Sequence, residues 1–463
     1  MKNVIKLSCL ALVLFFFSCK KDPEVAPEEK PTVTLSGEIK ENMTLQPEAE
    51  YLLKGTVFVK NNATLTIPAG TIVKAVYSAE TEGKSSLIVT QGSKLVVNGT
   101  ESTPVVFTSA AAEKKAGDWT GIIILGKAPT NLGKGSAMGL TAGTDTEFGG
   151  TTADDNSGSL KYMRIEYAGG LNPLKEAEWE RDIVSGLSLN SVGSGTQIDH
   201  IIVSNSKDDG YQFVGGTVNA KYLIGYNNGD DDFDFDRGYT GKLQFIISFK
   251  SALSPYAVRA NGMESLNDIA ASEVQPYTRP VISNMTIIGP NGVSTDLTDQ
   301  SQSIYIRKNT RFNVRNSVLA GYSNGGLMLC IKTKPILLNN QGSEFKYNLV
   351  NSDNGSRAFT FDSDGSGTNI VADPEVAGYA VLTGGTGTKP SVNNNKVINP
   401  IAGLQMKSAT LTVAADLSPA TGSIILSGAD FNDAQFSSFF SPVSFRGAIG
   451  SENWATGAWA NWK

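Results

Sequence analysis

The sequence predicts an all-β fold, a single right-handed parallel β-helix, from a repeat and from an alternating strand. Segments that begin at Thr196, Thr217 and Thr240 each lead into a short apolar run, at intervals of 21 and 23 residues. Periods of this length are typical of stacked solenoid repeats. In residues 232–236, Asp and Phe alternate with the period of two of a β-strand. We therefore expect one coil for each repeat, with equivalent side chains stacked in columns.

The alternation assigns a direction to each side chain. Phe233 and Phe235 should face the core, and Asp232, Asp234 and Asp236 should face outwards. Alignment of the repeats extends these directions to neighbouring coils. Two inward columns are expected, Leu187, Tyr211 and Phe233 in one, and Ile201, Leu223 and Ile246 in the other.

The N-terminal residues predict export and lipid anchoring. Residues 1–18 have the parts of a signal peptide, with Lys2 and Lys6 before an apolar run and Ser18 before Cys19. The run is too short for a permanent membrane span. Residues 16–19 resemble the lipobox of bacterial lipoproteins, which makes Cys19 the expected lipidation site; the alternative is an ordinary signal peptide. We therefore expect an outer membrane lipoprotein, on the cell surface or the periplasmic face.

The rest of the chain is expected to form one domain behind a tether. Residues 19–32 are rich in charge and proline, which predicts an extended, flexible segment. Residues 33–463 are assigned to the β-helix, including an N-terminal cap of roughly 60 residues, since an open coil end needs cover. Residues 134–159 are expected to form a long surface loop. The C-terminal end is rich in Trp.

Composition excludes several kinds of partner and site. The formal net charge is −6 and no basic patch is interleaved with aromatic residues, so a nucleic-acid partner is not expected. Cys330 is the single cysteine left after processing, which excludes an intramolecular disulfide. His200 is the only histidine, and it aligns with Tyr162, Tyr222 and Phe245, which predicts a place in an aromatic stack. A zinc site rich in His or Cys is also excluded.

Several motifs together resemble a known group of proteins. They are residues 65–71, 99–109, 117–122, 208–241 and 445–450, with Trp454, Trp459 and Trp462. The combination is similar to right-handed β-helix lipoproteins of Bacteroidetes that have the pectin-lyase-like fold. The resemblance spans nearly the whole mature chain. It implies a fold and a location, and no settled activity.

The chemistry-bearing residues are acidic and should be stacked. Asp208 and Asp209 of one coil should lie about 4.8 Å from Asp230 and Asp231 of the next. Carboxylates at that spacing repel by about 3 kcal/mol per pair at an effective dielectric near 20. Ca²⁺, which prefers oxygen ligands, would neutralise them, and so would the basic residues Arg237, Lys250, Arg259 and Arg307. The candidate metal ligands are Asp208, Asp209, Asp230, Asp231, Asp232, Asp234 and Glu264. A solvated acidic face is the alternative.

Three functions remain open at this point. The first is a binding module of the cell envelope, with a cation-supported acidic patch and a polysaccharide or an envelope protein as partner. The second is a polysaccharide lyase or glycoside hydrolase, for which the catalytic candidates are Asp208, Asp209, Asp231, Asp234 and Arg237. A Gly-His-Gly element of the polygalacturonases is missing, and an acidic cleft repels an acidic polymer, so we place the enzyme second. The third is a structural or adhesive stalk.

Overall fold

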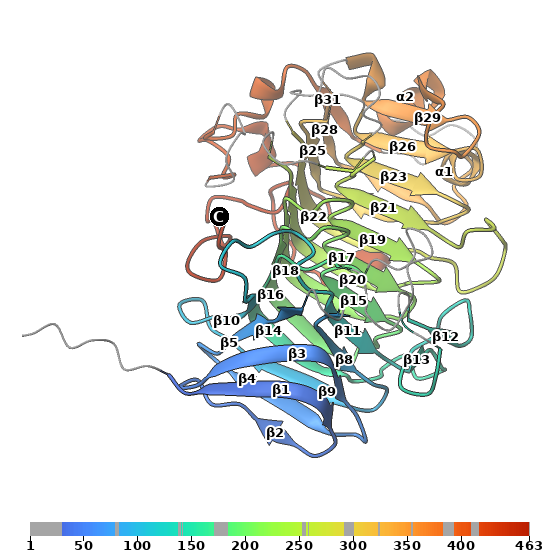
Figure 1. Ribbon diagram of the computed structural model, residues 1–463. Coiled ribbons are helices and arrows are strands. Elements are labelled where there is room, and N and C mark those ends of the chain that lie inside the picture. The colour runs from blue at the N-terminus through green and yellow to red at the C-terminus, as the bar shows by residue number, and fades with distance from the viewer. Residues whose placement is uncertain are drawn as a thin grey trace, which may run out of the picture.

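The protein is a parallel β-helix whose coils stack from the N-terminal to the C-terminal end (Figure 1). This computed structural model confirms the predicted fold class. It describes residues 30–78, 83–137, 140, 142–170, 184–251, 256–257, 259–290, 301–322, 325–352, 355–382, 393–408 and 416–462. The predicted signal peptide, Cys19 and most of the predicted tether lie outside the described residues.

Each complete coil contributes to three parallel sheets. The first sheet contains β2 (Met43–Thr44), β4 (Thr64–Pro68), β9 (Lys94–Asn98), the first halves of β14 (Gly158–Glu166), β16 (Gln197–Ser204), β18 (Asn219–Tyr226), β20 (Lys242–Phe249) and β22 (Val281–Ile288), then β24 (Asn313–Arg315) and β27 (Glu344–Lys346). The second sheet contains β5 (Ile72–Ala75), β10 (Val105–Ser109), the second halves of β14 to β22, then β25 (Val318–Ala320), β28 (Leu349–Asn351) and β31 (Lys396–Ile398).

The third sheet is built from short strands and carries the acidic residues. It contains β8 (Ser86–Val89), β11 (Gly121–Leu125), β15 (Leu187–Asn190), β17 (Tyr211–Val214), β19 (Phe233–Asp236), β21 (Met263–Leu266), β23 (Ile304–Arg307), β26 (Leu327–Cys330) and β29 (Phe359–Asp362). β1 (Thr32–Ile39) and β3 (Glu50–Val59) run through both the second and the third sheet. The segment expected to cap the N-terminal end therefore forms the first coils itself.

The predicted inward columns are confirmed. Leu187 pairs with Tyr211 and Tyr211 with Phe233, while Leu223 pairs with Ile201 and Ile246. All six side chains are fully buried in one continuous core. The rings of Tyr211 and Phe233 stack with their centroids 5.0 Å apart, so the repeat brings like side chains into direct contact.

The aromatic column around His200 is also confirmed, and it marks the bend between the first and second sheets. Tyr162, His200, Tyr222 and Phe245 have φ values of 49°, 53°, 58° and 59°, the left-handed region that non-glycine residues rarely adopt. Centroids of successive rings lie 4.4, 4.4 and 5.2 Å apart. Left-handed backbone costs about 1–2 kcal/mol per residue, and stacking contributes about 0.5–1.5 kcal/mol per pair. The stack therefore offsets much of the strain of the bend.

The Trp-rich C-terminal segment, residues 416–462, returns along the outside of the coils (Figure 1, red). Trp459 is fully buried and meets the His200 ring edge-on at 5.1 Å. Its backbone N–H donates to Glu101 O at 3.2 Å, so the segment reaches back to an early coil. Short 3₁₀ turns, η4 (Ile401–Leu404), η5 (Ile424–Leu426) and η6 (Ala434–Phe436), shape its path and the residues before it.

Other segments cover the third sheet and the C-terminal end. Strands β12 (Gly135–Ser136) and β13 (Glu147–Phe148) form a hairpin whose residues Ala137, Leu140 and Phe148 are buried against β11. The expected surface loop is therefore a hairpin that covers β11.

At the C-terminal end, α1 (Lys334–Leu338) and α2 (Pro374–Ala380) add Leu337 and Tyr379 to the core. The remaining described elements are the small antiparallel pair β6 (Tyr77–Ser78) and β7 (Gly83–Lys84), strand β30 (Ile370–Ala372), antiparallel to β29, and the 3₁₀ turn η3 (Gly355–Arg357). No helix in these described ranges is long and apolar enough to cross a membrane.

Truncation of a stacked core residue should destabilise the protein strongly. Leu223→Ala removes a fully buried side chain from the Ile201 and Ile246 column, and we expect it to lower the free energy of unfolding by about 2–5 kcal/mol. Ile269→Ala, at a side chain that is 53% exposed, should change it by no more than about 0.5 kcal/mol. Chemical denaturation of both variants measures this, and equal effects would contradict the assigned column.

Candidate functional site

The acidic cluster lies at the corner where the chain turns from the second sheet into the third. Asn205 and Asn227 end the strands β16 and β18 with φ values of 55° and 53°, a conformation that Asn tolerates well. The turns then pack closely on each other. A Cβ on Gly229 would lie 2.3 Å from Lys207 O, so glycine is required there. This close packing brings the aspartates of the two turns together.

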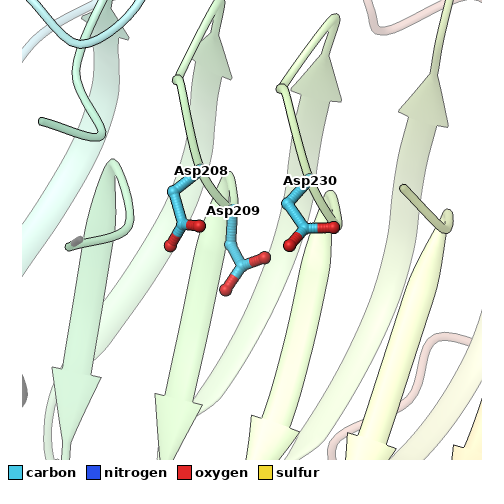
Figure 2. A group of neighbouring side chains, drawn as sticks. All are labelled: Asp208, Asp209 and Asp230. Carbon is cyan, nitrogen blue, oxygen red and sulfur yellow. The ribbon is translucent and has the colours of Figure 1, made fainter. Parts of the chain in front are cut away.

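Asp208, Asp209 and Asp230 project from these neighbouring turns (Figure 2). One carboxylate oxygen from each lies within 4.8 Å of the other two. Asp209 is buried, and its carboxylate accepts hydrogen bonds from Asp231 N at 3.1 Å and from Ser185 Oγ at 3.2 Å. Asp208 and Asp230 are partly exposed. The predicted neighbourhood of the two coils is therefore present, with one buried and two accessible carboxylates.

Four further carboxylates, those of Asp231, Asp234, Asp236 and Glu264, continue the acidic surface along the third sheet. Asp231 is buried, and its carboxylate accepts a 2.6 Å hydrogen bond from Asn261 N. Asp234 pairs in register with Gln212 on one side and Glu264 on the other. Gln212 donates to Asp234 Oδ2 at 3.4 Å. The other oxygen of Asp234 and Oδ1 of Asp236 are buried without a hydrogen-bond partner among the described residues.

Burial and mutual repulsion make these groups weak acids. Burial first, and neighbouring carboxylates second, raise the pKa of Asp209, Asp231 and Asp234 well above its usual value. The same causes raise the pKa of Asp230 to about 7, and burial raises that of Asp236 to about 7 against the opposing charge of Arg237. A cation entering this cluster would therefore displace protons, as metal ions do at protonated ligands.

Asp232 lies apart from this surface. Strand β19 starts at Phe233, so the expected outward direction of Asp232 is wrong. Its fully buried carboxylate accepts hydrogen bonds from Ser248 Oγ at 2.5 Å and Asn228 Nδ2 at 2.8 Å, and Lys250 Nζ lies 3.5 Å away. Lys250 also donates to two backbone carbonyls at 2.6 Å. Both residues belong to a buried structural network.

The remaining basic candidates near the cluster are engaged. Arg307 pairs with Glu264 at 3.0 Å, and its guanidinium lies 5.2 Å from the centroid of the Tyr305 ring. The Arg237 guanidinium lies 3.9 Å from Asp236. Arg259 donates to Ser366 O at 3.1 Å. Arg307 and Arg237 thus lie at the edges of the cluster, and the charges of Lys250 and Arg259 oppose the rise in the pKa of Asp230.

Asp362 is among the buried acids that sequence reasoning missed. Asp362 is fully buried at the end of β29, and Tyr305 Oη donates to it at 2.5 Å. Its carboxylate also accepts from Gly365 N and Gly367 N at 3.1 and 2.9 Å. Residues 359–362 alternate Phe with polar residues as residues 233–236 do, and this similarity was the available signal.

One family model matches the sequence over residues 37–353 and is described as a pectate-lyase-like β-helix domain. The chain belongs to this family. The match covers more than half of the chain and includes every carboxylate of the cluster around Asp208, Asp209 and Asp230. No characterised protein and no solved structure matches the chain.

The raised pKa values predict how the stability of this pectate-lyase-like β-helix domain depends on pH. In the absence of divalent cations, the folded protein binds more protons than the unfolded chain between about pH 4, where free aspartates titrate, and pH 7, the pKa of Asp230 and Asp236. Stability therefore falls as pH rises through this window, by at most about 1.4 kcal/mol per pH unit for each proton. Denaturation in chelator at pH 5, 6 and 7 measures the slope.

Substitution identifies the groups responsible for this slope. Asp236→Asn should reduce it, because one titrating group is removed while the shape of the side chain is kept. Asp154→Asn, at an exposed aspartate away from the cluster, should leave it unchanged. Stability that rises with pH between 5 and 7, in the wild type and in both variants, would rule out the assigned titrations.

Proposed function

We propose that the protein is a cation-dependent binding module of the cell envelope that docks a polysaccharide at the corner beside the third sheet. The group formed by Asp208, Asp209 and Asp230 carries this proposal, since it places three carboxylate oxygens within 4.8 Å of one another. A binding or polysaccharide-related role is also compatible with membership of a pectate-lyase-like β-helix family.

The chemistry of the cluster favours Ca²⁺. Ca²⁺ takes six to eight oxygen ligands in flexible geometry, whereas Mg²⁺ demands a near-ideal octahedron. Two turns of a β-helix supply carboxylates from one side, and Asp208 and Asp230 are partly exposed. The remaining coordination positions would be open to hydroxyl or carboxylate oxygens of a polysaccharide. The cation would also remove the repulsion between the cluster and an acidic polymer.

Catalysis is the second candidate, supported by the raised pKa values of the carboxyl groups. A carboxyl group with a pKa of about 7, such as Asp230, is suited to general acid catalysis. Glycosidases, however, separate their two carboxyl groups by about 5–9.5 Å, and the oxygens of this cluster are closer. A lyase needs a free base, and Arg237, Lys250, Arg259 and Arg307 are all engaged. Binding is therefore the better-supported function.

Calcium should stabilise the protein through this cluster. A ligand that binds only the folded state raises the free energy of unfolding by about 2.7 kcal/mol at a hundredfold excess over its Kd. We expect Ca²⁺ to raise the Tm of the wild type at pH 7.5, and the variant Asp209→Asn/Asp230→Asn to lose the increment. In chelator this variant should be as stable as the wild type or more stable, because repulsion is relieved.

The control is Asp154→Asn, which should keep the full response to Ca²⁺. A uronate-containing polysaccharide should bind more tightly in Ca²⁺ than in chelator, and Asp209→Asn/Asp230→Asn should remove this difference. A Tm that responds to neither Ca²⁺ nor chelator would contradict the cation site. If the protein released sugar from the same polysaccharide and Asp230→Asn abolished this release, the function would be hydrolysis and not binding alone.

Anchoring at the outer membrane forms the other part of the proposal. The lipobox-like residues 16–19 and the charged segment behind them support lipidation at Cys19. In bacteria that express the full chain, Cys19→Ser should move the protein from the membrane fraction to the soluble fraction. Protease shaving of intact cells then distinguishes the cell surface from the periplasmic face. Unchanged partitioning of Cys19→Ser would contradict the lipid anchor.

A further inference from the structure

A groove of about 340 Å³ lies on the outer face of the first sheet, away from the acidic corner. Strands β14, β16 and β18 and the turn before β16 form its floor, and Phe439 of the C-terminal segment forms a wall. This volume lies within the usual range of ligand sites, about 300–1,000 Å³. The lining side chains that could bind a ligand are Lys161, Gln197, Asp199, Asn219, Lys221 and Phe439.

The floor presents charged and amide side chains in register. Asp199 pairs with Lys161 on one side and Lys221 on the other, and Gln197 pairs with Asn219. Successive coils are about 4.8 Å apart, so the two lysines are about 10 Å apart. Asp199 is hydrogen-bonded to His200 Nδ1. Within the described part of the chain, neither lysine lies within 4.0 Å of an Asp199 oxygen, so the groove keeps a local excess of positive charge in a protein of net charge −6.

The aromatic wall is held in place by several contacts. Lys221 Nζ donates to Ser441 Oγ at 2.9 Å and lies 4.9 Å from the centroid of the Phe439 ring. The amide side chain of Gln244 donates to Ser441 O and accepts from Ser441 N, both at 2.8 Å. Next to Phe439, the ring of Phe440 is buried in an apolar cluster. The ring is therefore positioned before any ligand arrives, which reduces the entropy lost on binding.

We propose that this groove binds an acidic sugar, a pyranose that carries a carboxylate. Lys161 and Lys221 would each bind a carboxylate of one acidic sugar unit in charge-assisted hydrogen bonds, and the amides of Gln197 and Asn219 would bind hydroxyl groups. The ring of Phe439 would cover the apolar face of the sugar. Each Lys ammonium carries three donors, so Lys221 retains donors beyond the one that Ser441 accepts. Burial lowers the pKa of Lys221, and a bound carboxylate would counter this effect.

The groove goes beyond the proposed cation site and needs none of its residues. It lies on the first sheet, whereas the carboxylate cluster lies at the corner leading into the third. Its recognition groups are ammonium, amide and aromatic, and none of the three carboxylates of the cation site lines it. Binding in this groove should therefore persist in chelator and in Asp209→Asn/Asp230→Asn, so the two proposals can fail separately.

Calorimetric titration of the mature protein in chelator tests the groove. The probes are β-1,4-linked triglucuronic acid and its neutral counterpart, cellotriose. We expect the acidic trisaccharide to bind at least about tenfold more tightly, since its charge-assisted hydrogen bonds are lost in the neutral sugar. Lys161→Gln should weaken its binding by about tenfold, and 0.5 M salt should weaken it further by screening. Lys54→Gln, at an exposed lysine of β3, should have no effect.

The aromatic wall has its own pair of variants. Phe439→Ala should weaken binding, whereas Phe439→Tyr should preserve it because the ring remains. Circular dichroism of each variant confirms that it is folded. Equal affinity for the acidic and the neutral trisaccharide, or full affinity in Lys161→Gln, would overturn the proposal. Competition by inorganic sulfate at the concentration of the trisaccharide would also overturn it, since the groove would then be a simple anion site.

Discussion

The stacking of equivalent side chains at the spacing of parallel strands is the constraint on which the rest of the structure depends. Each coil places a side chain about 4.8 Å from its counterparts in the coils before and after it. The effect is favourable for Leu187, Tyr211 and Phe233, which become one apolar column. The same register is unfavourable for Asp208 and Asp230, which become neighbours in a partly buried corner. Core and candidate site thus arise from one geometric rule.

This rule explains how far the sequence predicts the molecule. The 21- and 23-residue intervals are sufficient to predict the columns and the place of His200. They are not sufficient at corners, where the period of two no longer applies. Asp232 lies one residue before the strand begins, and its side chain therefore points into the buried network with Lys250. Periodicity within a strand cannot reveal a side chain that packs across a turn.

Contacts between distant segments are the second limit. Phe439 contacts Lys221, and Trp459 contacts His200, across more than two hundred residues of sequence. The sequence indicates that the C-terminal end is rich in aromatic residues, but the sheet they cover depends on a return path along the coils. The hairpin β12–β13 is a similar case, because its Leu140 and Phe148 become buried only against β11 of another coil. Short-range patterns do not contain this information.

The protein can accommodate the repulsion in the acidic corner because the coils that carry the carboxylates also carry stabilising aromatic contacts. The stability of a solenoid is approximately a sum of local terms for each repeat and its neighbours. Asp234 and Asp236 face outwards from β19, while Phe233 and Phe235 of the same strand face inwards. Phe233 and Phe235 stack on Tyr211 and Phe213 with centroids 5.0 Å apart in both pairs. The coils that carry the repelling carboxylates therefore also carry large stacked rings, so the corner can retain weak acids that a cation is able to deprotonate.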